Sequence, residues 1–271
     1  MEYLPQAGIA GLRESDRTGI RGSMCSIIIL RRPGHAWPLI IAANRDEMLD
    51  RPWDPPGRHW DDRPEVVAGR DRLAGGSWLG RNDHGVFAAI LNREGSLGPS
   101  ADKRSRGELV LEALDHADAA DAAAALCGLD PHAYRSFNLV VGDNAHVFHV
   151  ANRAQAHAIT AEEIPPGLSM LTSQEVNDRR NARIAAYLAQ FEAAAAPDPD
   201  SGDWSAWRAV LSDGTYDPAI GPSAAMCIES DWGFGTVSST LLALPAPGAE
   251  DPRGIYLFAP GRPDTTEYLP V

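Results

Sequence analysis

The chain has 271 residues, 44% of them hydrophobic and 23% charged, and its formal net charge at pH 7 is −13. An acidic chain of this kind is a poor partner for nucleic acid or for an anionic membrane surface, because both require a basic face. Its longest apolar runs, residues 27–30 and 39–43, are too short to cross a bilayer. Three isolated cysteines, with no CxxC pair, indicate a reducing compartment, so we expect a cytoplasmic protein.

Residues 1–23 carry three arginines and three acidic residues but lack the apolar stretch of a secretory signal. Three explanations stay open for them: a start assigned too early, a propeptide removed to expose Cys25, or a flexible extension. Met24 is a ready alternative start, which favours the first. We expect residues 24–271 to form a single domain.

Short strands dominate the first part of the chain. Residues 26–30 form a β-branched run, with turn residues at 32–35 and a partner strand at 39–43. The stretch 52–64 is rich in proline and tryptophan and is expected to be a loop, because proline cannot pair within a central sheet. Further short strands, separated by glycine turns, are expected at residues 65–68, 77–79 and 85–90.

Helices and strands alternate in the remainder. An alanine-rich helix is expected over residues 106–127, ending at Gly128, and a second helix over 176–196. Asp203 is expected to cap a third helix, after a proline-rich loop at 197–202. The remaining strands are expected at residues 137–142, 145–150, 156–160, 168–172, 236–244 and 254–258. Many strands with few helices predict an α+β fold of two packed sheets with helices outside.

Cys25 directly follows Met24, so removal of the methionine makes it N-terminal. Its free α-amino group, with a pKa of about 8, can then take the thiol proton. A hairpin would bring the polar end of the second strand beside it: Asp46 to orient the ammonium group, Arg45 to lower the thiol pKa, and Asn44 to donate to an oxyanion. The ordinary alternatives are a buried cysteine and a surface turn.

Two later segments add candidates. Asn92 ends an apolar strand and offers an amide donor for the charge of a tetrahedral intermediate, although it is equally compatible with a plain strand end. Gly75 and Gly76 permit close backbone approach, and Trp78 offers an apolar wall, so these three are candidate substrate-binding residues. His146 and His149 lie three apart on an expected strand and face opposite ways, and we expect no metal site.

Six motifs occur in an order that resembles one known family. They are Met-Cys at 24–25, AANRDE at 42–47, GGSWLG at 75–80, SRGEL at 105–109, FNLVVGD at 137–143 and FGTVSST at 234–240. Together they resemble the NRDE family, whose eukaryotic members are called transport and Golgi organisation protein 2.

The resemblance implies a four-layer αββα sandwich of the N-terminal nucleophile hydrolase type, related to bile-salt and penicillin V acylases. It implies that Cys25 is the nucleophile, that Arg45 and Asp46 support it, and that Asn92 donates to the oxyanion. Two positions depart from the pattern: Ser173 stands where acylases carry an asparagine, and Val237 stands where many members carry an arginine.

Two functions are therefore expected. The first is a cysteine N-terminal nucleophile hydrolase that cleaves an amide or thioester of a small acyl compound. The second is a non-catalytic module that handles or transports haem or lipid on the same scaffold, with a tryptophan-rich stretch over residues 53–78 lining an apolar pocket. Neither requires a cofactor, and haem enters only as a ligand of the second. The substrate and the oligomeric state are not given by the residues.

Overall fold

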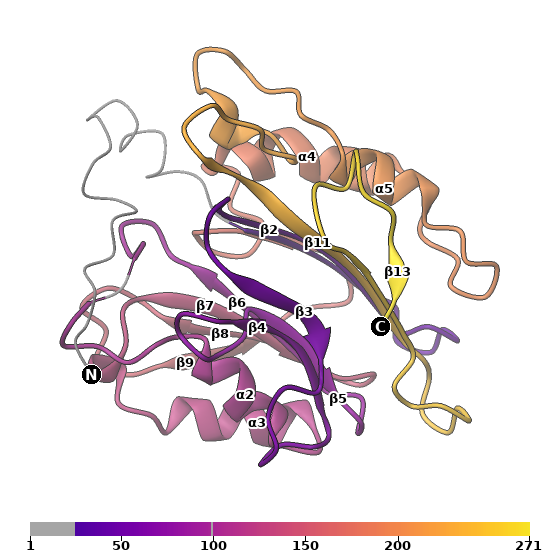
Figure 1. Ribbon diagram of the computed structural model, residues 1–271. Helices are drawn as coiled ribbons and strands as arrows, with labels where there is room; N and C mark the ends of the chain where they lie inside the picture. Colours follow the sequence, from indigo (N-terminus) through magenta and orange to yellow (C-terminus); the bar gives the residue numbers. More distant parts are fainter. Residues whose placement is uncertain (1–24, 99) are drawn as a thin grey trace.

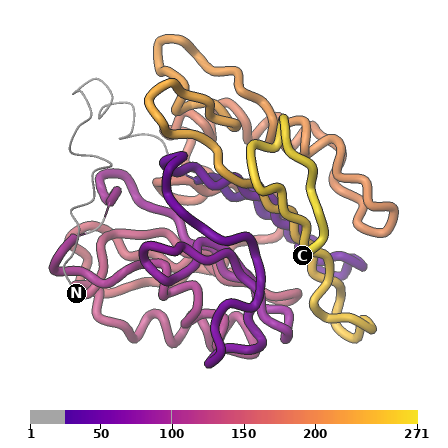
Figure 2. The backbone as a smooth tube through the Cα atoms, in the orientation of Figure 1, coloured from indigo at the N-terminus to yellow at the C-terminus, as the bar shows by residue number. Residues whose placement is uncertain are grey.

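Two antiparallel sheets lie face to face in the computed structural model, which describes residues 25–98 and 100–271 (Figures 1 and 2). The expectations for residues 1–23 and for Met24 lie outside the described residues. The first sheet has the strand order β10 (Gly167–Leu171), β1 (Ser26–Arg31), β2 (Leu39–Met48), β11 (Phe234–Leu244), β12 (Ile255–Ala259) and β13 (Leu269–Pro270). The second has the order β3 (Trp53–Gly57), β4 (Val66–Asp71), β5 (Leu79–Asn82), β6 (Phe87–Asn92), β7 (Phe137–Gly142), β8 (Val147–Asn152) and β9 (Thr160–Glu163).

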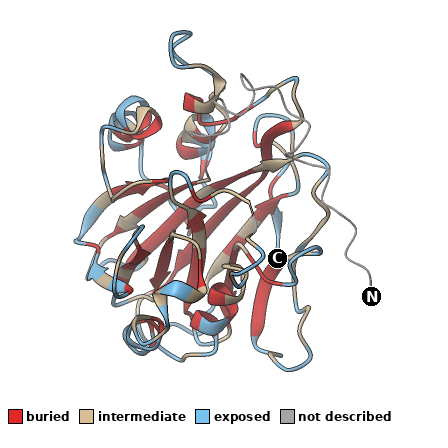
Figure 3. Cartoon of the chain, turned by 90° about the vertical axis from the view of Figure 1, so that its left-hand side faces the viewer, coloured by how far each residue is buried: buried red, intermediate tan, exposed pale blue. Residues whose placement is uncertain are grey.

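Helices cover the outer face of each sheet, which gives four layers (Figures 1 and 3). Helices α2 (Glu108–Leu114) and α3 (Ala119–Cys127) pack on the second sheet, and α4 (Ala182–Ala193) and α5 (Ser205–Leu211) pack on the first. Two 3-10 turns, η1 (Pro131–Ala133) and η2 (Pro222–Ala224), complete the ordered elements. The predicted αββα sandwich is confirmed. No helix in the described part of the chain is both long and apolar enough to span a membrane.

The three core layers follow from strand alternation. Successive side chains of a strand point to opposite faces, so Ile27 and Ile29 pack between the sheets while Ile28 packs under the α4–α5 layer. Strands buried on both faces read as continuous apolar runs, which is why β1 and the first half of β2 are almost entirely aliphatic. The strand residues next to Cys25 are therefore buried on both faces of the first sheet, alternately against the second sheet and against the helix layer.

The helix expected over residues 106–127 is wrong, because the structure has α2 and α3 with a break between them. Asp118 begins the second helix by accepting a hydrogen bond from the Asp121 backbone N–H. The Asn82 side chain, from β5, donates to the carbonyls of Leu114 and His116 at the end of the first helix. These contacts satisfy backbone groups that a continuous helix would have paired internally.

The second helix was expected over residues 176–196, and the observed helix α4 starts later than that. It begins at Ala182 rather than 176, because the Asn181 side chain accepts from the N–H groups of Arg183 and Ile184 and so caps it. Asn177 has a positive φ of 57°, which a right-handed helix excludes. Residues 172–181 are therefore a loop that follows β10.

Three further boundaries differ from expectation. The proline-rich stretch contains β3, which the sheet tolerates because it is an edge strand. The strand expected at 156–160 is displaced to β9. Strand β2 continues to Met48, so the Asn-Arg-Asp-Glu run lies inside a strand rather than after one.

Candidate active site

Cys25 lies just before β1, at the mouth of a small cavity between the two sheets. Its Sγ accepts a hydrogen bond from the Asp46 backbone N–H at 3.4 Å and lies 3.7 Å from the Asp46 carbonyl oxygen. Burial, and after it the charge of the Asp46 carboxylate, raise the pKa of the Cys25 thiol to about 11, against the opposing effects of the Asp46 N–H and Arg45. With a residue in front of it, Cys25 thus holds a protonated thiol.

Strand alternation divides the Asn-Arg-Asp run between two faces of the sheet. Ser26 of β1 pairs with Asn44, which places Cys25 opposite Arg45 when the same register is continued by one residue. Arg45 points into the cavity between the sheets, whereas Asn44 and Asp46 point toward the helix layer, as their contacts show. The structure brings the run beside Cys25, as predicted, but only one of its side chains enters the cavity.

Asp46 is held on the helix side by two partners. Arg183 Nη1 of α4 donates to Asp46 Oδ2 at 2.8 Å, and the Thr236 hydroxyl donates to Oδ1 at 2.7 Å. The same Arg183 nitrogen donates to Ser26 Oγ at 2.7 Å. Burial raises the pKa of the Asp46 carboxyl, and the charge and hydrogen bond of Arg183 oppose that rise. Asp46 therefore ties β1, β2, β11 and α4 together directly under Cys25.

Arg183 was missed at the sequence level, although a signal for it existed. It occupies the same helical stripe as Tyr187 and Phe191, at spacings of four and eight residues. An arginine on the buried stripe of a helix indicates a buried anionic partner. The partner itself, 137 residues away in the chain, could not be read from that spacing.

Asn44 has no free amide hydrogen. Its Nδ2 donates to the backbone carbonyls of Leu211 and Met226, each at 2.9 Å, and its Oδ1 accepts from the Ser239 hydroxyl at 2.6 Å. The predicted donation from Asn44 to an oxyanion does not fit this arrangement. Its side chain instead fastens α5 and the segment before β11 to the central strand.

Arg45 and Trp78 form the wall of the cavity next to Cys25. The guanidinium carbon of Arg45 lies 4.2 Å from the centroid of the Trp78 ring, a cation–π contact. Burial lowers the pKa of Arg45, and Glu47, whose carboxylate is 3.8 Å from Nη2, opposes that shift. Arg45 Nη1 is buried and has no hydrogen-bond partner among the described residues. The cavity holds about 20 Å³, enough for roughly one water molecule.

A β-bulge shapes the opposite wall. Thr236 pairs with Asp46, and Ser238 pairs with the adjacent Arg45, so Val237 is the extra residue of β11. Without the bulge, residues 236 and 238 would point to the same face. With it, Thr236 points to the helix side and Ser238 lines the cavity. Val237, the position of the expected arginine, is a buried apolar residue at the irregularity.

The other predicted site residues have different positions. Gly75 has a φ of +77° in a turn, and Gly76 packs against the Gly107 backbone, so neither is among the cavity-lining residues. Asn92 ends β6 as predicted but pairs with Phe137, on the face that packs against α2 and α3. Of the three predicted substrate-binding residues, Trp78 alone lines the cavity.

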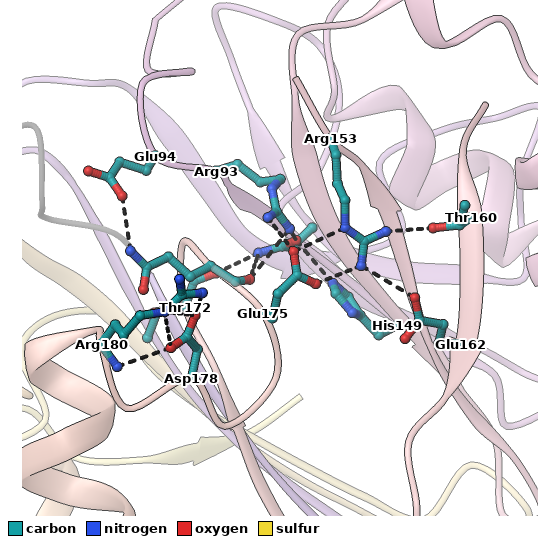
Figure 4. A network of polar contacts seen from close by, with 12 residues as sticks. Arg93, Glu94, His149, Arg153, Thr160, Glu162, Thr172, Glu175, Asp178 and Arg180 are labelled. Atoms are coloured by element: carbon teal, nitrogen blue, oxygen red, sulfur yellow. Dashed lines mark hydrogen bonds and ion pairs between the residues drawn. The ribbon is translucent and has the colours of Figure 1, made fainter. Parts of the chain in front are cut away.

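Ser173 lies in the loop that follows β10, and continuing the Ile27–Leu171 register by two residues places it opposite Cys25. Its Oγ accepts a 3.4 Å hydrogen bond from the Asn181 side chain, the cap of α4. A polar network fixes the same loop to the second sheet (Figure 4).

The centre of that network is Glu175. It accepts from Arg93 Nη2 at 2.5 Å and from Arg153 Nη2 at 2.6 Å. Burial alone would raise the pKa of Glu175, but the bonds from the two arginines outweigh it and lower that pKa to about 2. Buried Asn138 of β7 donates to the carbonyls of Thr172 and Gln174 and completes the attachment. The loop opposite Cys25 is thus held by groups from the other sheet.

Among the described residues, no three His, Cys, Asp or Glu side chains are grouped so that they could hold a metal ion. His149 Nε2 lies 3.0 Å from Asn138 Oδ1 and belongs to the network of Figure 4, while His146 contacts Glu163.

Comparison with known proteins gives one family. The sequence model of Transport and Golgi organisation 2 matches residues 24–248. The human Transport and Golgi organization protein 2 homolog is 28% identical over 246 residues, which cover 79% of this chain and 84% of the human protein. The Bos taurus homolog is 27% identical over 243 residues, with the same coverage.

The solved structure of a Caenorhabditis elegans N-acylethanolamine-hydrolyzing acid amidase ortholog has the same fold. The TM-score is 0.54 at 13% sequence identity, and the match covers 91% of this chain and 100% of the amidase chain. The sandwich described above is accordingly of the N-terminal nucleophile hydrolase type.

Proposed function

Since the chain belongs to the Transport and Golgi organisation 2 family, we propose that it is a hydrolase whose nucleophile is Cys25, acting once Cys25 is N-terminal. The bond cleaved is the C–N bond of an amide, or a thioester, in a small acyl compound. The observation that carries this proposal is the position of the Cys25 thiol at the mouth of the cavity, beside Arg45 and against the Asp46 N–H. The amide-hydrolysing structural neighbour supports the reaction class.

The chemistry requires a base for the thiol. A thiol with a pKa of about 11 is a poor nucleophile at neutral pH, because only its thiolate attacks. A free α-amine on the same residue, with a pKa of about 8, removes the thiol proton as the C–S bond forms. It then returns that proton to the leaving amine as the C–N bond breaks, and water releases the acyl group from the thioester.

The small volume of the cavity restricts the substrate. About 20 Å³ admits roughly a water molecule, so a longer acyl group requires the stacked Arg45 and Trp78 side chains to move. Short acyl compounds are therefore the first substrates to test.

Acyl-enzyme trapping is the direct experiment. The chain is produced from Met24, its intact mass is checked for loss of the methionine, and it is incubated with short N-acyl amides and thioesters. Acid quenching and peptide mass analysis should place the acyl group on Cys25, and Cys25→Ala should abolish both adduct and hydrolysis.

Cys127→Ser is the matched control, because Cys127 lies at the end of α3, among the elements that cover the outer face of the second sheet, and is half-buried. This variant should retain full activity. Hydrolysis that survives in Cys25→Ala, or a panel in which no compound acylates Cys25, would contradict the proposal.

A non-catalytic haem- or lipid-handling role on the same scaffold is the second candidate. Trp78 packs edge-on against Trp53, which packs edge-on against Phe258, each at 5.8 Å between ring centroids, so apolar rings continue outward from the cavity wall. Saturable haem binding, followed by the Soret band and unchanged in Cys25→Ala, would favour this role. A titration without saturation would count against it.

A further inference from the structure

Two polar groups in the cavity lack partners. Arg45 Nη1 and Ser238 Oγ are both buried, with residue exposures of 6% and 1%, and neither has a hydrogen-bond partner among the described residues. Both residues line the cavity that holds Cys25. A buried polar group without a partner is costly, so a pair of them in one cavity indicates a ligand that supplies the missing bonds.

The two groups lie side by side because of the bulge at Val237. Arg45 and Ser238 are direct partners in the β2–β11 register and share the inner face of the sheet. Directly opposed residues of an antiparallel pair have their Cβ atoms about 5 Å apart, within reach of one small ligand group. A strand without the bulge would put residue 238 on the helix side, so this pairing is a local and specific feature of β11.

The charge of the pair defines what it binds. Arg45 is a cation, and its nearest carboxylate contact, Glu47, is 3.8 Å from Nη2, too long for a hydrogen bond. Ser238 adds a hydroxyl that can donate. A guanidinium nitrogen and a hydroxyl side by side are donors for two oxygens of one anion, and a planar carboxylate matches the guanidinium fork.

We propose that Arg45 and Ser238 form a carboxylate-binding subsite beside Cys25, and that the substrate is a short amide or thioester bearing a carboxylate close to the scissile carbonyl. This inference rests on the proposed function for its substrate but not for its site. Because the cavity is small, the carboxylate of the substrate must lie within a few bonds of the carbonyl carbon that Cys25 attacks.

Two alkylating reagents that differ in one group test the subsite without any turnover. Iodoacetate carries a carboxylate next to the reacting carbon, and iodoacetamide carries a neutral amide there. With either reagent the thiolate forms a C–S bond, the C–I bond breaks, iodide leaves and the thiol proton goes to solvent. The ratio of the two rates does not depend on the thiol pKa, because the same thiolate reacts with both reagents.

The rates are measured at pH 8 on the 271-residue chain, by peptide mass analysis at each cysteine. Cys127, half-buried at the end of α3, serves as the internal reference. We expect the iodoacetate-to-iodoacetamide ratio at Cys25 to exceed that at Cys127 by about tenfold or more, the worth of a hydrogen bond to a charged group. The preference should disappear in Arg45→Met and fall about tenfold in Ser238→Ala, and Ser238→Thr should restore it.

Arg81→Met is the matched control. Arg81 is as buried as Arg45, at 6% exposure, and also has unpartnered nitrogens, but it is not among the residues lining the cavity. Its substitution should leave the ratio at Cys25 unchanged, which separates a local carboxylate site from a general effect of losing a buried charge.

Equal ratios at Cys25 and Cys127, or a preference that survives in Ser238→Ala, would overturn the subsite. Failure of the proposed function gives a different pattern, because the alkylation preference would persist while no amide is cleaved. Cleavage of neutral amides with no alkylation preference would keep the hydrolase and remove the subsite.

Discussion

The Asp46–Arg183 ion pair is buried on both sides, with side-chain exposures of 0% and 3%. Each carboxylate oxygen of Asp46 has a partner, and Arg183 also reaches Ser26 and the Ser223 carbonyl. Buried charges of this kind are stable only as a complete set, because removal of one partner leaves the other charge uncompensated. The pair positions the strand residues next to Cys25 and does not enter the cavity itself.

Arg183→Met should lower the free energy of unfolding by about 3–5 kcal/mol, since Asp46 would be left buried with only Thr236 as a strong partner. Urea denaturation measures this change. The control is Arg180→Met in the loop before α4, which breaks an ion pair with Asp178 at an arginine side chain that is 82% exposed and should change stability little. Equal losses in the two variants would contradict the structural role of the buried pair.

Neighbouring residues of one tetrapeptide have separate tasks here, and the sequence alone could not assign them. The motif and the expected hairpin correctly predicted that Asn44, Arg45 and Asp46 lie near Cys25. Alternation within a strand then separates Arg45 from the other two, and this was not foreseen because the run was expected to follow the strand. The partners that decide each role, Arg183 and Ser239, come from distant parts of the chain.

At the scale of the elements, a close approach of two glycines joins α2 to the turn between β4 and β5. A Cβ atom added to Gly76 would lie 2.4 Å from the carbonyl carbon of Gly107 and 2.6 Å from its oxygen. The Ser77 N–H donates to that same oxygen at 3.0 Å. The GGSWLG and SRGEL motifs therefore meet in space, and their glycines serve packing rather than substrate binding.

Gly76→Ala should destabilise the protein by about 1–3 kcal/mol or more, because the clash is with backbone that cannot rotate away. Gly214→Ala is the control, since a Cβ there meets its nearest atom, the Cys227 carbonyl oxygen, at an ordinary 3.5 Å. Thermal or urea unfolding of the two variants makes the comparison. A Gly76→Ala variant as stable as Gly214→Ala would show that the two motifs do not pack this closely.

Strand positions were largely predictable from the sequence, and the interruptions were not. The apolar runs predicted β1, β7 and the first half of β2 with small errors, because strands buried on both faces have few alternatives. Asp118, inside the expected helix, caps α3 instead, and the Asn82 side chain that ends α2 comes from a strand of the second sheet. The bulge at Val237 depends on pairing with β2 and left no local signal.

At the scale of the whole molecule, the network of Figure 4 joins the loop that follows β10 of the first sheet to the second sheet. The Asn138 side chain of β7 donates to the loop after β10. The Oδ1 atom of Asn138 is in turn hydrogen-bonded to His149 Nε2 of β8. Burial lowers the pKa of His149 to about 4, a shift that Glu175 opposes and that Arg153 and Arg93 reinforce. The imidazole is therefore neutral in the folded protein and donates through Nε2.

The free energy of unfolding should decrease as the pH falls, because His149 is buried in its neutral form. Its folded-state pKa of about 4 lies below the ordinary 6.5, so its contribution is complete above pH 6.5 and is lost as the pH falls toward 4. The loss amounts to about 3 kcal/mol by pH 4. His149→Gln keeps a donor to Asn138 but cannot titrate, so urea denaturation from pH 7 to pH 4 should show a shallower decline. Parallel curves for the two proteins would contradict a buried neutral histidine.

The N-terminal sequence of an active preparation tests the nucleophile most directly. Any active preparation, whether expressed from Met1 or from Met24, should consist of protein that begins at Cys25, as read by Edman degradation and intact mass, because only a free α-amine supplies the base for its thiol. An equally active protein that still carries residues 1–24 would contradict this mechanism, since a peptide-bonded Cys25 has no α-amine.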